Sequence, residues 1–270
     1  MIESIFKYNF LQNALFAAIL GSFVCGIVGT IIVEKKLVSM SGGIAHSSFG
    51  GIGLAYLIGI EPVIGALVFA LFASVSIPVI NKRTNTNADT LIGMFWSVGM
   101  ALGIFFITIM PGYPPDLTSY LFGDILTVSK LYIYIMFILT VIILVVISSL
   151  FKYWQAFLFD KEYSKIIKIK SEFMEYVLMV IIGISVVVLI KVVGIILAIA
   201  MLTIPAAISR MFTYNLKKTM ILAVLLGMLF TLLGLYISYN YNIPSGATII
   251  ILAVCIYFFS IGLKKVLKIE

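Results

Sequence analysis

The segment from Ser39 to Tyr56, which reads SMSGGIAHSSFGGIGLAY, contains His46, the only histidine of the chain. A neutral imidazole binds metal cations, and it takes up a proton close to neutral pH. An ionisable side chain between long apolar segments therefore predicts either a binding site or a buried hydrogen bond. Hydroxyl oxygens that are available for a cation on the same segment belong to Ser39, Ser41, Ser47 and Ser48.

A stripe of small residues runs along this segment. Gly43, Ser47, Gly51 and Ala55 recur every four residues, so they share one face of a helix. Such a face lets the backbone of another membrane helix approach closely. We therefore predict that these four residues pack against a neighbouring helix.

His46 lies on the adjacent face, together with Gly42, Gly50 and Gly53. Glycines around an imidazole leave open space for a cation, and they equally allow tight packing with His46 hydrogen-bonded to a neighbouring helix. The residues alone leave both interpretations open.

The composition indicates whether the chain lies in water or in a membrane. Of its 270 residues, 63% are hydrophobic and only 11% are charged, which predicts an all-α, polytopic bundle of transmembrane helices. In such a protein the net charge of +7 reports orientation, so we expect a membrane environment and no nucleic-acid partner. Cys25 and Cys255 lie far apart in apolar runs and indicate no disulfide framework. We expect one continuous membrane domain over residues 1–270.

Apolar runs of near-membrane length predict nine spans. The join from Lys191 to Gly194 is short for a hairpin, so the two spans beside it are alternatively one broken element, which leaves eight. The predicted spans are 11–33, 41–59, 62–80, 91–110, 130–150, 173–191, 193–211, 219–239 and 245–263.

Basic residues predict the orientation of these spans. All 18 Lys and Arg residues except Lys7, Lys130 and Lys191 fall in alternate connections or at the C-terminal end, and this side should be the cytoplasm. In the nine-span arrangement the N-terminus is then outside and the C-terminus is inside. We expect a multi-pass protein of the cell membrane.

Two connections are more than simple turns. The outer loop 111–116 is rich in proline, which suits either an ordinary hairpin or a gate, and it leads to Asp124 in a short amphipathic stretch. The cytoplasmic segment 151–172 mixes aromatic and charged residues. It is typical either of a short helix that fits a partner's groove or of a helix on lipid headgroups.

The sequence contains no chemistry for binding ATP. A P-loop places Lys directly after glycine, and the dipeptide Gly-Lys does not occur in the chain. No nucleophile elbow or zinc-protease motif is present either, so we expect a transport subunit and no enzyme. If ATP drives transport, a separate subunit must bind it.

Several motifs occur in a recognisable order between about residues 35 and 250. The histidine segment is similar to the GDxxxHxxxxG segment of the permeases of zinc and manganese ABC importers, the ABC-3 family. The chain therefore resembles a type II ABC importer-like permease. The later matches are Asp89–Gly93, Leu121–Leu126, Phe159–Tyr163, Val192–Leu197 with Leu202–Ala207, and Pro244–Thr248.

The resemblance implies roles for individual residues. It makes His46, with Ser47 and Asp124, a candidate for the cation pathway, although many relatives carry Asn at the position of Asp124. A mundane role is expected for Asp89, whose carboxylate favours the positive end of a helix. The ATPase-coupling residues that the resemblance implies are Phe159, Asp160, Glu162 and Tyr163.

The resemblance further implies separate cytoplasmic ATP-binding subunits, an extracellular metal-binding protein and a second permease copy in a homodimer. The cargo would be a divalent cation, namely zinc, manganese or iron, and no permanently bound cofactor is expected. One departure concerns Gly42, where many relatives carry Asp, so His46 lacks a carboxylate one helical turn away. A permease for another solute such as a metal chelate therefore remains an alternative. A stand-alone secondary transporter and a non-transporting scaffold are two further alternatives.

Overall fold

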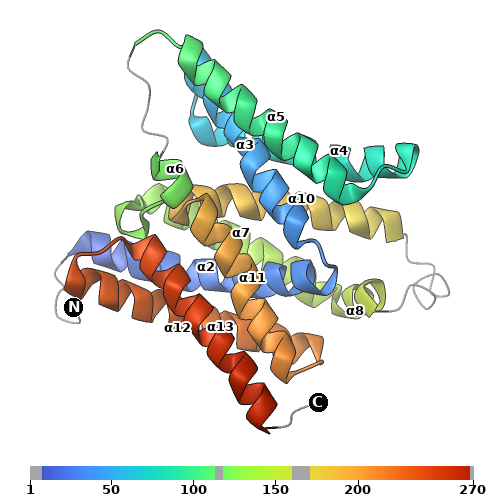
Figure 1. Ribbon diagram of the computed structural model, residues 1–270, viewed down its shortest axis with the longest axis vertical. Coiled ribbons are helices and arrows are strands. Elements are labelled where there is room, and N and C mark those ends of the chain that lie inside the picture. The colour runs from blue at the N-terminus through green and yellow to red at the C-terminus, as the bar shows by residue number, and fades with distance from the viewer. Residues whose placement is uncertain (1–7, 113–117, 160–170, 268–270) are drawn as a thin grey trace. The chain divides into compact units, whose positions relative to one another are not determined.

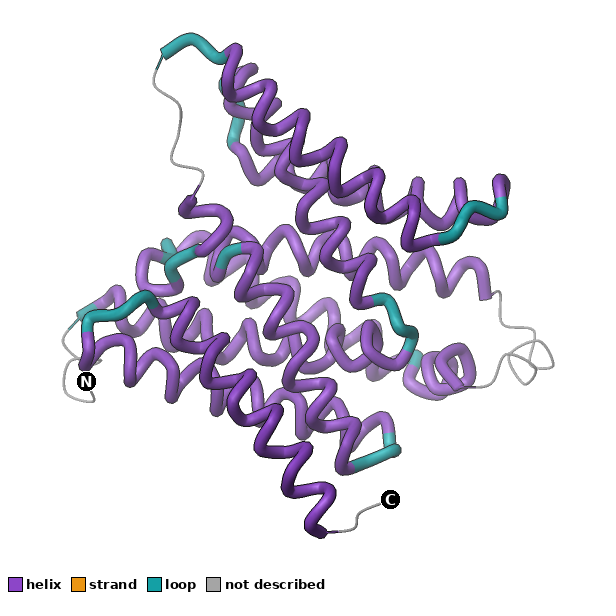
Figure 2. Tube along the Cα trace, in the orientation of Figure 1, coloured by secondary structure: helices purple, strands orange, loops and turns teal. Residues whose placement is uncertain are grey.

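The computed structural model describes residues 8–112, 118–159 and 171–267. Figure 2 shows only helices and loops in these ranges, with no strand. The predicted all-helical fold is confirmed for the part of the chain that is described.

Each predicted span corresponds to a long helix. The α10 and α11 helices are separate and are joined by Gly194 alone, whose φ of +82° and ψ of 164° suit glycine. The bounds are α2 (Asn9–Glu34), α3 (Val38–Ile58), α4 (Pro62–Thr84), α5 (Ala88–Ile109), α7 (Lys130–Ser149), α10 (Ser171–Val193), α11 (Ile195–Phe212), α12 (Leu216–Tyr241) and α13 (Ser245–Leu267).

Eight of these long helices are apolar enough to cross a membrane by length and composition. The exception within the described residues is α3, because its glycines and serines lower its hydropathy. The chain is therefore a multi-pass membrane protein.

Local sequence explains where several helices end. The α3 helix stops at Gly59, which takes the left-handed conformation at φ +75°. Pro62 begins α4 at a position where its missing N–H is not needed. Asn87 caps α5, since its side chain accepts a hydrogen bond of 2.9 Å from the backbone N–H of Asp89. As predicted, Asp89 lies in the first turn of this helix.

Three short helices complete the described chain. The α6 helix (Thr118–Phe122) and the 3-10 helix η1 (Ile125–Thr127) precede α7, while α8 (Phe151–Phe159) follows it. The outer-loop residues 113–116, named above as a hairpin or gate, lie outside the described residues.

The chain forms two compact units, and each is discontinuous in sequence. Unit 1 contains residues 1–35, 118–151 and 192–270, and unit 2 contains residues 36–117 and 152–191. Since both units draw on distant stretches of chain, neither is a domain in the sense of a contiguous segment.

In unit 1, α2 packs against α7, α11 and α12 (Figure 1). Two glycines of α2 allow this packing: Gly29 faces the backbone of Leu202 in α11, and Gly26 faces the backbone of Val224 in α12. An ion pair joins the ends of α2 and α11, with 2.8 Å between Glu34 Oε1 and Arg210 Nε. Close backbone contact is typical of membrane helices that pack through small residues.

In unit 2, α3 packs against both α4 and α5 (Figure 1). The α10 helix approaches α4 at Gly183, where a Cβ would lie 3.3 Å from the Ser74 hydroxyl oxygen. Lys82 at the end of α4 pairs with Glu175 of α10 at 2.9 Å. The α3 helix, which has the lowest hydropathy of these long helices, thus packs against two apolar helices.

Candidate functional site

The α3 helix is held by contacts between backbones. A Cβ on Gly53 would lie 2.5 Å from the Gly103 carbonyl oxygen of α5, and Gly51 of α3 meets Gly65 of α4 directly. Because neither pair has side chains between its helices, α3 is fixed in position and rotation. The side chain of His46 therefore has a defined direction.

The predicted stripe of small residues divides between two neighbours. Gly43 faces Ile92 of α5, where a Cβ would lie 2.5 Å from the Ile92 side chain, and the backbone of Ser47 lies against Gly99. Gly51 and Ala55 instead face Gly65 of α4. One stripe thus serves two interfaces, since α3 contacts both helices.

Two glycines on the His46 face are also packed. A Cβ on Gly50 would lie 2.9 Å from the Gly99 carbonyl oxygen and equally close to Phe69, and Gly53 meets Gly103 as described above. Packing therefore fills the space that an open cavity would need beside Gly50 and Gly53.

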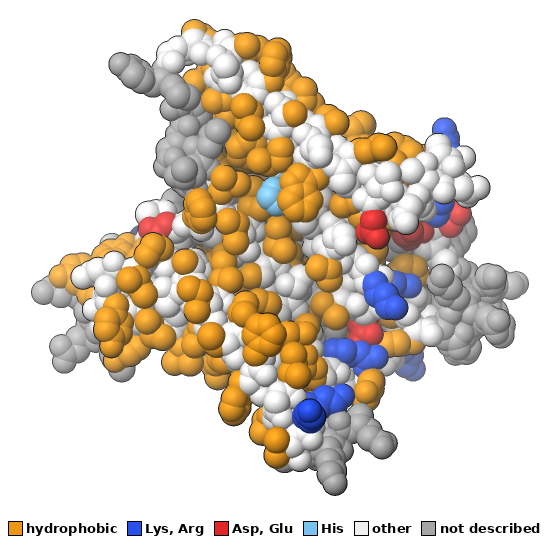
Figure 3. Space-filling model, viewed as in Figure 1, with side chains coloured by type: hydrophobic (Ala, Val, Ile, Leu, Met, Phe, Trp, Pro, Cys, Tyr) orange, Lys and Arg blue, Asp and Glu red, His pale blue; other side chains and the backbone are white. Residues whose placement is uncertain are grey.

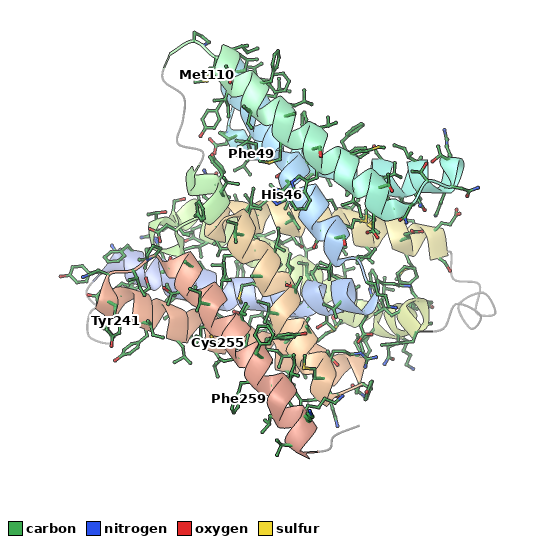
Figure 4. The ribbon with its side chains drawn as sticks, in the orientation of Figure 1. His46, Phe49, Met110, Tyr241, Cys255 and Phe259 are labelled. Atoms are coloured by element: carbon green, nitrogen blue, oxygen red, sulfur yellow. The ribbon has the colours of Figure 1, made fainter. Side chains whose placement is uncertain are left out.

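His46 itself stacks on an aromatic ring of α5. The centroids of the His46 and Trp96 rings are 4.0 Å apart, and their planes differ by 6°. Trp96 is 42% exposed, so the pair lies at the surface of unit 2, where the imidazole is visible in Figure 3. Figure 4 shows His46 and the buried Phe49 projecting from the same helix. The stack covers one face of the imidazole and restricts the orientation of its ring plane, in which both nitrogens lie.

Two polar atoms beside this stack have no partner. His46 Nδ1 and Ser47 Oγ are buried and make no hydrogen bond with any residue that the structure describes. Ser41 and Ser48 differ, since their hydroxyls donate to Val38 and Ala45 carbonyls of their own helix at 2.8 and 2.6 Å. An unpaired buried acceptor is costly, and it is a feature that a bound cation would explain.

No group of three His, Cys, Asp or Glu side chains lies close enough to hold a metal ion among the described residues. Any cation at His46 would therefore depend on hydroxyl, carbonyl or water oxygens, or on ligands from elsewhere.

The two predicted pathway residues belong to different units, because Asp124 lies in unit 1 and His46 lies in unit 2. One carboxylate oxygen of Asp124 accepts hydrogen bonds from the Leu126 N–H at 3.0 Å and from the Ser245 hydroxyl at 3.2 Å. These bonds cap η1 and attach it to the beginning of α13.

The Asp124 junction, defined as residues 122–124, 193–194 and 245–246, brings three predicted motifs together. The backbones of Gly123 and Gly194 touch, and both residues have positive φ. A Cβ on Gly246 would lie 3.0 Å from the Phe122 carbonyl oxygen. Three segments that are far apart in sequence thus form one contact, which the sequence analysis did not predict.

The described part of the cytoplasmic segment is the α8 helix. Trp154 and Phe157 are buried and meet edge to face at 6.0 Å, whereas Tyr153 and Phe159 are about half exposed. The other coupling residues named above, Asp160, Glu162 and Tyr163, lie outside the described residues.

Comparison with known proteins identifies the fold as one already seen in transporters. The profile of the ABC 3 transport family matches residues 7–264. The chain belongs to this family. The resemblance seen in the ordered motifs is thereby confirmed.

Several family members are similar over nearly their whole length. A membrane protein of Synechocystis sp., slr2045, is 38% identical over 98% of this chain and 94% of its own. The manganese import system permease protein ScaB of Streptococcus gordonii is 34% identical over 96% and 93%. The manganese transport system membrane protein MntC of Listeria monocytogenes is 31% identical over 95% and 91%.

Solved structures show the same fold. PsaBC from Streptococcus pneumoniae, in complex with Fab, matches with a TM-score of 0.86 and 34% identity over 96% of this chain and 93% of that one. A putative metal-chelate type ABC transporter in an inward-facing conformation matches with a TM-score of 0.75 at 14% identity, which supports the fold alone. The predicted permease architecture is confirmed.

Proposed function

We propose that this chain is the membrane permease subunit of an ATP-driven importer for divalent metal cations, with manganese as the favoured cargo. The observation that carries the proposal is near full-length similarity, above 30% identity, to relatives named as manganese import or transport proteins. The fold that the chain shares with PsaBC supports the same assignment.

His46 and Ser47 are the residues that we assign to the cation pathway. Their unpaired nitrogen and oxygen atoms support this role, because a neutral imidazole is a common metal ligand and Mn²⁺ takes oxygen ligands such as carbonyl or water. A pathway must also release its ion, so a site without a carboxylate beside His46 suits transport better than storage. For Asp124 we favour holding the junction, since its hydrogen bonds already fill that role.

We propose that nine helices span the membrane, namely the eight apolar helices and α3. Support for α3 comes from its 21 residues and from its position against two apolar helices, with Ser41, Ser47 and Ser48 buried. The N-terminus would then be outside and the C-terminus cytoplasmic, as the distribution of Lys and Arg indicates.

We propose that residues 1–270 act as one permease domain and that residues 151–172 dock on a separate ATPase. The exposed Phe159 at the end of α8 supports a docking role, as does the absence of a Gly-Lys dipeptide from the sequence. A second copy of the chain would complete the pathway, and an extracellular protein would deliver the cation. Large apolar side chains exposed on α5 and α13 are consistent with such a dimer.

Reconstitution tests this proposal. The chain, its cognate ATPase and its binding protein are placed in proteoliposomes, and ATP-dependent uptake of Mn²⁺ is measured with Zn²⁺ and Fe²⁺ as competitors. We expect uptake of Mn²⁺ that requires all three proteins, and Phe159→Ala should weaken co-purification of the ATPase. Uptake without the ATPase, or no uptake of any of the three cations, would contradict the proposal.

A further inference from the structure

Two apolar grooves run along the side of unit 1 where α2 and α7 pack together. The first, of about 560 Å³, lies between the second halves of α2 and α7 and the first half of α12. The second, of about 600 Å³, lies between the first halves of α2 and α7. Both volumes are in the range of sites for organic ligands.

The two grooves occupy opposite ends of the helices. The α2 and α7 helices begin at the same end, because the Asn13 side-chain amide donates to the Val128 carbonyl at 3.1 Å. A 20-residue helix spans about 30 Å, which is the thickness of the hydrocarbon core. Each groove therefore spans about one leaflet of the bilayer.

A lysine lies at the outer end of each groove. Lys217, in the first turn of α12, lines the first groove, and Lys130, the first residue of α7, lines the second. Both side chains are exposed. At these positions an ammonium group lies at the level of lipid headgroups, while the body of the groove faces the acyl chains.

The remaining lining of the first groove is almost entirely apolar. Phe23 and Ile27 of α2, Leu144 of α7 and Leu225 of α12 are typical of it, and Ser148 is the only other polar residue. A partner helix seated here would take the Lys217 ammonium out of contact with headgroups and water, at a considerable cost. A phospholipid would instead place its phosphate beside that ammonium.

We propose that the first groove, called the Lys217 groove, binds an anionic phospholipid with an acyl chain along α2, α7 and α12 and its headgroup at Lys217. This end of unit 1 also carries Lys35, Lys218, Lys264 and Lys265, while Arg210 is paired with Glu34, so the net field favours a lipid with net negative charge. The second groove likewise combines an apolar body with a lysine, Lys130, at its outer end, but in the other leaflet. This is expected if both grooves hold lipids.

Native mass spectrometry of the full chain in mild detergent tests this site. The chain is titrated with dioleoyl-phosphatidylglycerol and, separately, with dioleoyl-phosphatidylcholine. We expect tighter retention of phosphatidylglycerol, and Lys217→Gln should weaken it roughly fivefold while leaving phosphatidylcholine unchanged. The matched control is Lys218→Gln, which removes the neighbouring exposed lysine outside the groove and should therefore weaken retention of phosphatidylglycerol clearly less than Lys217→Gln does.

A second variant tests the apolar body of the groove. Leu225→Trp fills it from an exposed position and should weaken retention of both lipids, provided that the variant remains monodisperse. If the Lys217 and Lys218 variants lose phosphatidylglycerol retention equally, general surface charge explains the retention and the proposal is overturned. Retention of neither lipid by the wild-type chain would also overturn it, and would leave the groove to a protein partner.

Discussion

The α3 helix and the Asp124 junction each present one side chain of the metal-ligand type, but the two regions use it differently. The Nδ1 atom of His46, which stacks on Trp96, has no hydrogen-bond partner among the described residues. In contrast, one oxygen of Asp124 accepts hydrogen bonds from a backbone N–H and a hydroxyl. Both regions are built by contacts between glycine backbones. The two regions differ in that the fold uses an oxygen of Asp124 for structure, while it leaves the Nδ1 atom of His46 without a hydrogen-bond partner among the described residues.

The largest effect is expected at the junction. Gly194→Ala places a side chain in a backbone conformation that essentially only glycine adopts, and its Cβ would meet the backbone of Gly123. The free energy of unfolding should fall by about 3 kcal/mol or more, measured by thermal denaturation of the purified chain. Gly262→Ala is the control, because nothing lies within 4 Å of that position. Equal stability of the two variants would show that the junction does not support the fold.

The next effect is expected at the contact between α3 and α5. Gly99→Ala drives a methyl group into the backbone of Ser47, so we expect a loss of about 1–3 kcal/mol in the same assay. Gly93→Ala is a matched control on the same helix, since its Cβ would meet nothing within 4 Å. That variant should be unchanged or slightly more stable, by up to about 1 kcal/mol. The idea that backbone contact positions His46 fails if both variants behave alike.

The smallest effect separates capping from ligation at Asp124. Asp124→Ala should cost about 1 kcal/mol of stability, because the cap on η1 and the bond to Ser245 are both lost. Asp124→Asn retains an acceptor oxygen in the same place, so stability and Mn²⁺ uptake should stay close to wild type. Loss of uptake in the Asn variant with normal stability would instead identify Asp124 as a cation ligand.

Helix positions could be predicted from the sequence because each depends on local hydropathy. All nine predicted spans coincide with long helices to within a few residues. Even α3, whose hydropathy is lower than that of the other long helices, coincides with the predicted span 41–59 because its run is of near-membrane length. These signals lie within about twenty residues of chain.

Contacts between distant segments could not be predicted in the same way. The stripe through Gly43 and Gly51 predicts close packing but does not say that it serves two different helices. Nothing in the sequence around Trp96, which is an ordinary member of an apolar run, pairs it with His46. Gly194, which stands alone between two apolar helices, indicates an unusual backbone conformation at that position. It does not indicate that the backbone of Gly123 packs against it.

The proposed cation pathway depends on contact between His46 and the transported ion. The most direct test is Mn²⁺ uptake by proteoliposomes that contain the assembled transporter with His46→Gln, normalised to the amount assembled. Since loss of even an outer partner of a metal site costs roughly 10–100-fold in affinity, we expect uptake to fall at least tenfold, with assembly and thermal stability unchanged. Normalised uptake at the wild-type level would contradict a role for His46 in the pathway. Poor assembly or lower thermal stability of the variant, with normal uptake per assembled transporter, would show that His46 is structural.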